Sequence, residues 1–168
     1  NLALGLFQKG EKDEAIKLWE KCVLINPNYV SARQNLATCF LMDNEYEKAI
    51  YQWEQIRMLQ PSSPQPMLVL AELNYRAGNL SKAKEIAEEV LDAQRQTEPT
   101  DIDERKFRSD CEFLSGTVNL ALGNAREGLR NWLAAMRYNP NFALESGAFI
   151  SRAIWPELIA FAKENAKT

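Results

Sequence analysis

The sequence predicts an all-α protein built from repeated pairs of antiparallel helices. Apolar residues recur at helical spacing along the chain, and no stretch shows the sustained alternation of a strand. Several residue types also return at a fixed period of 34 residues, which is the length of one helical hairpin. The length of 168 residues suits one domain with its own core, so we expect a single domain over residues 1–168.

The repeat is marked by small residues, tryptophans, prolines and turn formers. Within the first three units these marks are Ala15, Ala49 and Ala83; Trp19 and Trp53; Pro27 and Pro61; and Gly10, Asn44 and Gly78. The marks return at Gly123, Trp132 and Pro140 with an offset of 11 residues. One insertion of that length, between the third and fourth units, therefore restores the register.

Each mark has a physical reason in a helical hairpin. Glycine and asparagine tolerate the left-handed backbone with which a helix ends and the chain reverses. Alanine is small enough for two helices to approach closely, and the tryptophan about one turn later fills the space between hairpins. Proline ends the second helix, because its ring and missing N–H do not fit a helix interior.

A helix–turn–helix unit with these marks resembles the tetratricopeptide repeat family. The second unit carries the fullest set, namely Leu36, Ala37, Phe40, Tyr46, Ala49, Trp53 and Pro61. The third and fourth units depart from the pattern at Asn74, Asn119 and Gly128. The resemblance covers roughly residues 1–142 and implies a right-handed α-solenoid of about four units, at about 1–29, 30–63, 64–98 and 101–142.

The insertion, at about residues 93–103, lies between two long helical patterns. Pro99 must break a helix, and Thr100 followed by Asp103 predicts a new helix start of the capping-box type. The patterns over residues 80–96 and 102–122 predict two overlong antiparallel helices that project beyond the stack. The alternative is a solvated extension with no partner.

The two ends of the sequence differ from the repeats. Residues 142–154 predict one more helix, and Pro156 suits the first turn of another, so we expect a terminal helix pair at 143–168 that caps the array. At the other end the sequence opens in the middle of a helical pattern at Leu2, without the pattern of a signal peptide. We therefore expect a fragment of a longer protein.

The composition argues against several classes of function. Histidine, the commonest general base and zinc ligand, is absent, and no apolar run approaches the roughly 20 residues of a membrane helix. The net charge of −3 argues against nucleic-acid and anionic-lipid partners. Cys22, Cys39 and Cys111 form no metal-binding or redox spacing, which predicts free thiols and favours a cytoplasmic location. A periplasmic or membrane-anchored parent protein is the alternative. We expect no catalytic residue, no metal and no cofactor.

The family resemblance implies that the first helix of each unit lines a concave groove. The residues expected to face this groove are Leu4, Phe7, Gln8, Ser31, Gln34, Thr38, Leu41, Met42, Gln65, Leu68, Glu72, Tyr75, Arg76, Asp110, Phe113, Thr117 and Leu120. This set is mostly apolar or uncharged, so it suits an extended or helical segment of another protein. We expect a scaffold, adaptor or chaperone-like interaction module.

Self-assembly into a homo-oligomer is the alternative, acting through the ends of the array or the overlong helix pair. An apolar face around Leu2, Leu6 and Phe7 would otherwise meet water.

A sharper version of the groove is the carboxylate clamp of tetratricopeptide modules that bind the acidic C-terminal tails of heat-shock chaperones. Asn35 stands at the asparagine position of the second unit. Leu4 replaces the asparagine of the first unit, however, and Gln65 and Val69 replace the two cations of the third. A bound carboxylate would lack its cations, so the sequence argues against this clamp.

Catalysis and nucleic-acid binding are weaker interpretations of the same groove. Glu72, Tyr75 and Arg76 share one helix face and Asp110 could face them, but no nucleophile–base pair or phosphate-binding loop accompanies them. For RNA, the groove offers little beyond Arg76 to reach phosphates. The short basic cluster of Arg105, Lys106 and Arg108 is flanked by acidic residues.

Overall fold

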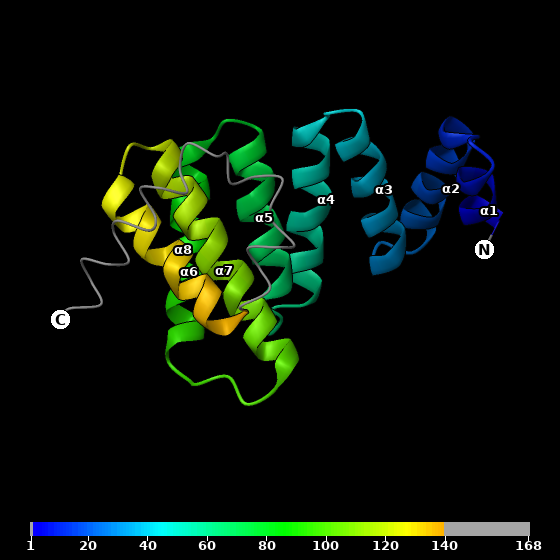
Figure 1. Ribbon diagram of the computed structural model, residues 1–168. Helices are drawn as coiled ribbons and strands as arrows, with labels where there is room; N and C mark the ends of the chain where they lie inside the picture. Colours follow the sequence, from blue (N-terminus) through cyan, green and yellow to red (C-terminus); the bar gives the residue numbers. More distant parts are fainter. Residues whose placement is uncertain (1, 140–168) are drawn as a thin grey trace. The chain divides into compact units, whose positions relative to one another are not determined.

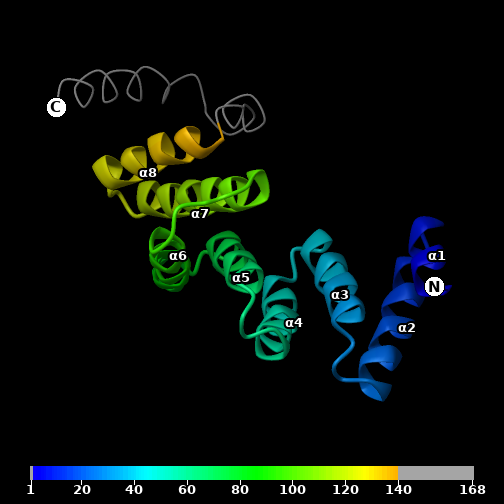
Figure 2. The same cartoon turned by 90° about the horizontal axis from the view of Figure 1, so that it is seen from below.

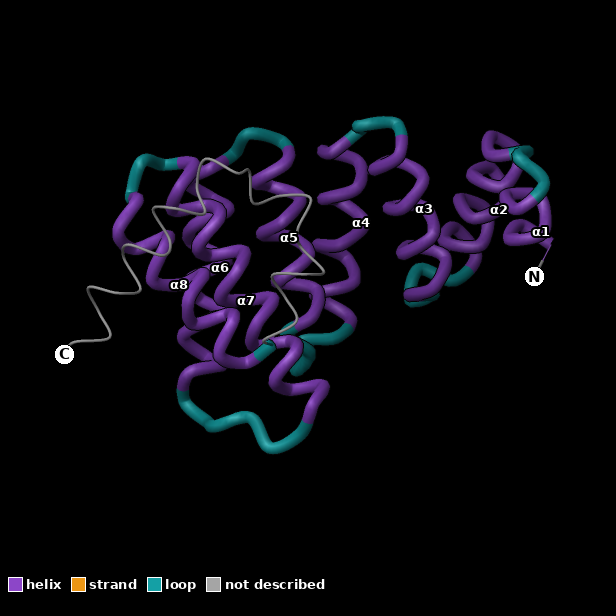
Figure 3. Tube along the Cα trace, viewed as in Figure 1, coloured by secondary structure: helices purple, strands orange, loops and turns teal. Residues whose placement is uncertain are grey.

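The computed structural model describes residues 2–139, which form helices joined by short turns and contain no strand (Figure 1; Figure 3). The helices are α1 (Leu2–Gln8), α2 (Lys12–Ile25), α3 (Val30–Met42), α4 (Tyr46–Leu59), α5 (Gln65–Arg76), α6 (Leu80–Arg95), α7 (Ile102–Ala121) and α8 (Ala125–Tyr138). The all-α prediction is confirmed over this range. Pro140 and the terminal pair expected at 143–168 lie outside the described residues.

The helices group into two compact units, residues 1–79 and residues 80–168. In the first unit, each of α1 to α4 packs against the next helix in the chain. Figure 2 shows α1, α3 and α5 on one side of this unit and α2 and α4 on the other. In the second unit, α7 packs against both α6 and α8.

The turn residues adopt the left-handed backbone that their spacing predicts. Gly10, Gly78 and Gly123 have φ angles of 88°, 82° and 83°, and Asn44 has a φ of 58°. Each lies just after a first helix, where the chain reverses into the second. Because this conformation is strained for most other residues, these four residues determine where the hairpins of the array turn.

The prolines also end helices as predicted. α2 ends at Ile25 and α4 ends at Leu59, two residues before Pro27 and Pro61. The short connections that follow lead directly into α3 and α5. The 34-residue period therefore corresponds to a physical unit of two helices and two turns.

The interior of each hairpin follows the predicted division between small and large residues. Ala15, Ala49 and Ala83 are fully buried. Trp19 and Trp132 are buried as well, as their repeat position predicts. Trp53 is only half-buried, so the expectation that it fills the space between hairpins is met in part.

In the α7–α8 hairpin, two glycines stand at the contact between the helices, at positions where the other helix-pair repeats carry alanine. A Cβ atom on Gly116 would lie 2.3 Å from Cδ1 of Trp132 and 2.8 Å from the carbonyl oxygen of Gly128. A Cβ atom on Gly128 would lie 2.6 Å from Cγ of Leu120. The two backbones are therefore closer than alanine would permit. This close crossing explains why the fourth repeat departs from the pattern at Gly128.

Polar side chains complete the α7–α8 contact. The Ser109 hydroxyl donates to the carbonyl oxygen of Ala135 at 2.9 Å, and the Asn131 amide donates to the Ser115 hydroxyl at 2.8 Å. All of these groups are buried. Because an unpaired buried polar group is costly, these bonds restrict how α8 can lie on α7.

The overlong helix pair is confirmed: α6 has 16 residues and α7 has 20, against 14 in α2, α4 and α8. The second helix begins at residue 102 as predicted, but the predicted capping residue, Thr100, is wrong by one position. Asp101 is the N-cap, accepting from the backbone N–H of Glu104 at 2.8 Å. The Glu104 carboxylate, and not that of Asp103, reaches back to the backbone N–H of Thr100 at 2.7 Å.

An ion cluster around a buried carboxylate joins the two long helices. The Glu112 carboxylate on α7 is almost fully buried and accepts from Nη2 of Arg95, at the end of α6, at 3.0 Å. Nε of Arg108 lies 3.7 Å from the same carboxylate, and its Nη1 donates to the carbonyl oxygen of Gln94. The Arg108 guanidinium also lies over the Tyr138 ring, 5.1 Å from its centroid. The hairpin is therefore an ordered extension.

Substituting Gly116→Ala should destabilise the second unit. The new methyl group has no space against Trp132 and the Gly128 backbone, and overpacking of this kind costs about 1–3 kcal/mol. Gly5→Ala is the matched control, because a Cβ atom there meets nothing within 4 Å. Thermal unfolding followed by circular dichroism should show a lower Tm for Gly116→Ala only; equal Tm values would contradict the close crossing.

Replacing Glu112 with glutamine should also destabilise the hairpin, because the buried Arg108 loses its counter-charge. Removing one partner of a buried ion pair costs roughly 3 kcal/mol or more. Glu85→Gln, at an exposed position with no ion pair among residues 2–139, should change the free energy of unfolding by less than about 0.5 kcal/mol. Urea titration of both variants measures the difference, and a Glu112→Gln variant as stable as its control would refute the role of the cluster.

Candidate protein-binding surface

The predicted groove residues of the first unit lie on α1, α3 and α5, the side seen together in Figure 2. The exposed ones are Leu4, Gln8, Ser31, Gln34, Thr38, Met42, Gln65 and Arg76, which we call the first-helix face. The half-buried ones are Phe7, Leu41, Leu68, Glu72 and Tyr75. The first-helix face combines apolar and amide side chains, with Leu4 40% and Met42 60% exposed.

The charges near this face neutralise each other. Nε of Arg76 donates to Oε1 of Glu72 at 3.0 Å, one helical turn away on α5. An exposed i,i+4 pair is an ordinary support of a surface helix. This contact favours the structural interpretation of the pair, and Asp110, the second carboxylate of the catalytic hypothesis, belongs to the other unit.

Phe7 contributes to the interior of its hairpin. Its ring lies 5.9 Å from that of Trp19, centroid to centroid, with the two planes tilted by 53°. This separation is typical of an aromatic contact. The apolar surface that remains exposed near the start of the first unit is therefore that of Leu2 and Leu4.

In the second unit, all four predicted groove residues are half-buried: Asp110, Phe113, Thr117 and Leu120. The Phe113 ring stacks on that of Trp132 with centroids 5.5 Å apart. The Trp132 indole N–H donates to the Thr117 hydroxyl oxygen at 3.2 Å, and Leu120 packs against the Leu129–Trp132 cluster. Three of the four side chains thus hold α8 in place, and we centre the candidate surface on the first unit.

The second helices expose apolar residues that the sequence analysis did not identify. Leu24 and Ile25 are 82% and 84% exposed at the end of α2, and Met58 is 72% exposed near the end of α4. Leu24 and Met58 are 34 residues apart and so occupy one repeat position. The sequence signal for these residues is an apolar side chain at a repeat position that does not belong to the apolar face of its helix.

Two further classes of site are absent from the described residues. Residues 2–139 contain no group of three or more acidic, cysteine or histidine residues placed to hold a metal ion. None of the helices α1 to α8 combines the length and hydropathy needed to cross a membrane.

The three cysteines are unpaired and differ in accessibility. Burial raises the pKa of the Cys111 thiol to about 12, and the negative charge of Asp110 adds to the shift. Burial also raises the pKa of Cys39. Cys22 is half-buried. Because the thiolate is the reactive form, burial and a raised pKa make Cys39 and Cys111 less reactive than an exposed cysteine.

Comparison with known proteins agrees with this geometry. Residues 18–51 match the family model described as tetratricopeptide repeat, whereas no curated protein sequence matches the chain. A crystal structure of MamA superposes with a TM-score of 0.69 at 16% identity, over 100% of this chain and 98% of that one. The structure of residues 41 to the end of MamA from Desulfovibrio magneticus RS-1 has a TM-score of 0.62 at 15% identity, over 83% of this chain and 72% of that one. The structure of Pseudomonas aeruginosa PilF has a TM-score of 0.64 at 17% identity, over 95% of this chain and 72% of that one.

The predicted resemblance is thereby confirmed: the chain carries a tetratricopeptide repeat at residues 18–51 and shares a helical-repeat fold with these structures. Such folds are, in general, protein–protein interaction modules. The chain has the fold of such a module.

Thiol labelling should separate the three cysteines. At pH 8 and under native conditions, a disulfide reagent such as dithionitrobenzoate should react with Cys22 first, because Cys39 and Cys111 are buried and their raised pKa leaves little thiolate. Mass spectrometry of the labelled protein identifies the modified residue. A Cys22→Ser variant should show little rapid labelling, and fast modification of Cys111 would contradict the described core.

Proposed function

We propose that this chain binds an extended or helical segment of another protein on the first-helix face of its first unit. The observation that carries the proposal is the chemical character of that face. Seven of its eight exposed residues are uncharged, and the eighth, Arg76, is paired with Glu72. A peptide that presents apolar side chains and backbone amides would lose little solvation energy there.

The side chains of the face suit different parts of such a ligand. Met42 and Leu4 provide apolar contact, and methionine adapts its shape to different partners. The amides of Gln8, Gln34 and Gln65 each offer both a donor and an acceptor, which matches the backbone of a peptide. We infer a scaffold, adaptor or chaperone-like role in which the ligand is held by contacts and undergoes no chemistry.

A pair of methionine substitutions tests this assignment. A peptide selected on the full chain from a random displayed library should bind Met42→Arg at least about tenfold more weakly, because a charge replaces an apolar contact. Met58→Arg makes the same change at an exposed position on α4, on the opposite side of the unit, and should leave the affinity unchanged. Fluorescence anisotropy of the labelled peptide gives both dissociation constants.

Loss of affinity in Met58→Arg, with Met42→Arg unaffected, would move the site to the second helices and overturn the proposal. Equal affinities for the parent and both variants would also place the ligand elsewhere.

A further inference from the structure

We propose that copies of this chain associate through opposite charges carried by two surfaces of the second unit. One surface is a stripe of arginines on α8, and the other is an acidic patch on the α6–α7 hairpin. The contact lies outside the first-helix face and does not depend on the peptide-binding function proposed above.

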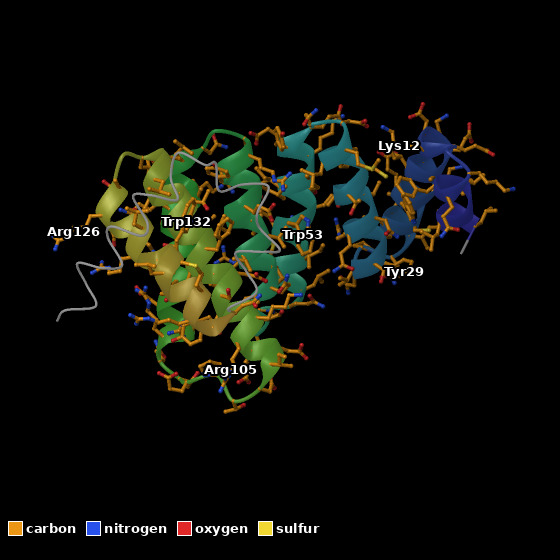
Figure 4. The ribbon with its side chains drawn as sticks, viewed as in Figure 1. Lys12, Tyr29, Trp53, Arg105, Arg126 and Trp132 are labelled. Atoms are coloured by element: carbon orange, nitrogen blue, oxygen red, sulfur yellow. The ribbon has the colours of Figure 1, made fainter. Side chains whose placement is uncertain are left out.

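The arginine stripe consists of Arg126, Arg130 and Arg137. Their spacings of four and seven residues place them along one side of α8, and all three are exposed. Arg130 lies 3.6 Å from Glu127, which is its single ion pair among the described residues. Neither Arg126 nor Arg137 makes an ion pair within residues 2–139. Figure 4 shows Arg126 pointing away from the helices.

The α6–α7 hairpin has the opposite charge. Residues 85–112 contain ten acidic residues and four basic ones. Two of those cations, Arg95 and Arg108, are committed to the buried Glu112. The acidic patch consists of the exposed residues Glu85, Asp92, Glu98 and Asp103.

Arg105 and Lys106 are exposed on the same hairpin, but the four carboxylates of the patch make few ion pairs in the described part of the chain. Asp92 lies 3.8 Å from Arg95, which already pairs with Glu112, and the other three carboxylates make no ion pair in the described part of the chain. The cap at Asp101 and the Glu112 cluster stabilise the backbone of the hairpin that carries these carboxylates.

A second copy is the partner that these charges specify. α7 packs against both α6 and α8, and within residues 80–139 no ion pair joins the stripe to the patch. Guanidinium groups bind carboxylates with two parallel hydrogen bonds, so arginine facing aspartate and glutamate gives a directional contact. The contact made twice closes a dimer, and made once per copy it extends an array. The small net charge of −3 permits close approach of two copies.

Sedimentation velocity of the full chain over a range of concentrations, at about 50 mM and about 500 mM salt, tests the proposal. The mass should rise with concentration at low salt and return to that of the monomer at high salt, where charges are screened beyond a few ångströms. A stripe variant, Arg126→Glu/Arg130→Glu/Arg137→Glu, should raise the dissociation constant at least about tenfold, because attraction becomes repulsion.

The matched control is Lys9→Glu/Lys17→Glu/Lys21→Glu, which changes the net charge equally at exposed positions of the first unit and should associate like the parent. A patch variant, Glu85→Lys/Asp92→Lys/Glu98→Lys, should be defective alone but should form mixed complexes with the stripe variant. Circular dichroism confirms that each variant is folded.

A parent chain that stays monomeric at every concentration in low salt would overturn the proposal, and an acidic partner protein would then be the occupant of the stripe to consider. Equal weakening in the stripe variant and the lysine control would also overturn it, since net charge would then be the cause. Failure of the two defective variants to complement each other would exclude direct pairing of the two surfaces.

Discussion

The structure depends on the close approach of two helices in each hairpin. Ala15 and Ala49 are fully buried on the second helices of the first unit, and Gly116 and Gly128 bring α7 and α8 closer still. Small residues at the crossing allow large ones to pack beside it, as Trp132 does against Phe113. The crossing, together with left-handed turns at residues such as Gly10, determines which side of every helix remains exposed.

The exposed sides differ in chemistry. In the first unit, α1, α3 and α5 present amides and flexible apolar groups such as Met42, a surface suited to backbone and apolar contacts. In the second unit the corresponding side chains of α7 are used to hold α8, and the exposed residues are largely charged. One fold therefore provides two surfaces of different chemistry, and we propose that the uncharged one binds a peptide and the charged one a second copy.

The sequence predicted the helices and turns well because both depend on local backbone chemistry. Asn44 and Gly78 tolerate the left-handed backbone of a turn without help from distant residues. Pro61 ends a helix because its ring and missing N–H do not fit a helix interior. The Arg95–Glu112 pair joins residues 17 apart, so only the folded hairpin brings these charges together. The repeat position also does not give side-chain contacts: Phe7 and Phe113, both expected at groove positions, each contact a tryptophan in the folded chain.

Hydrogen–deuterium exchange with and without a selected peptide tests the central claim, that the first-helix face binds a protein segment. The account predicts that the peptide slows exchange in α1, α3 and α5, whereas α2, α4 and the α6–α7 hairpin keep their free rates. Slower exchange confined to α2 and α4, where Leu24 and Met58 are exposed, would contradict the account and place the ligand on the second helices.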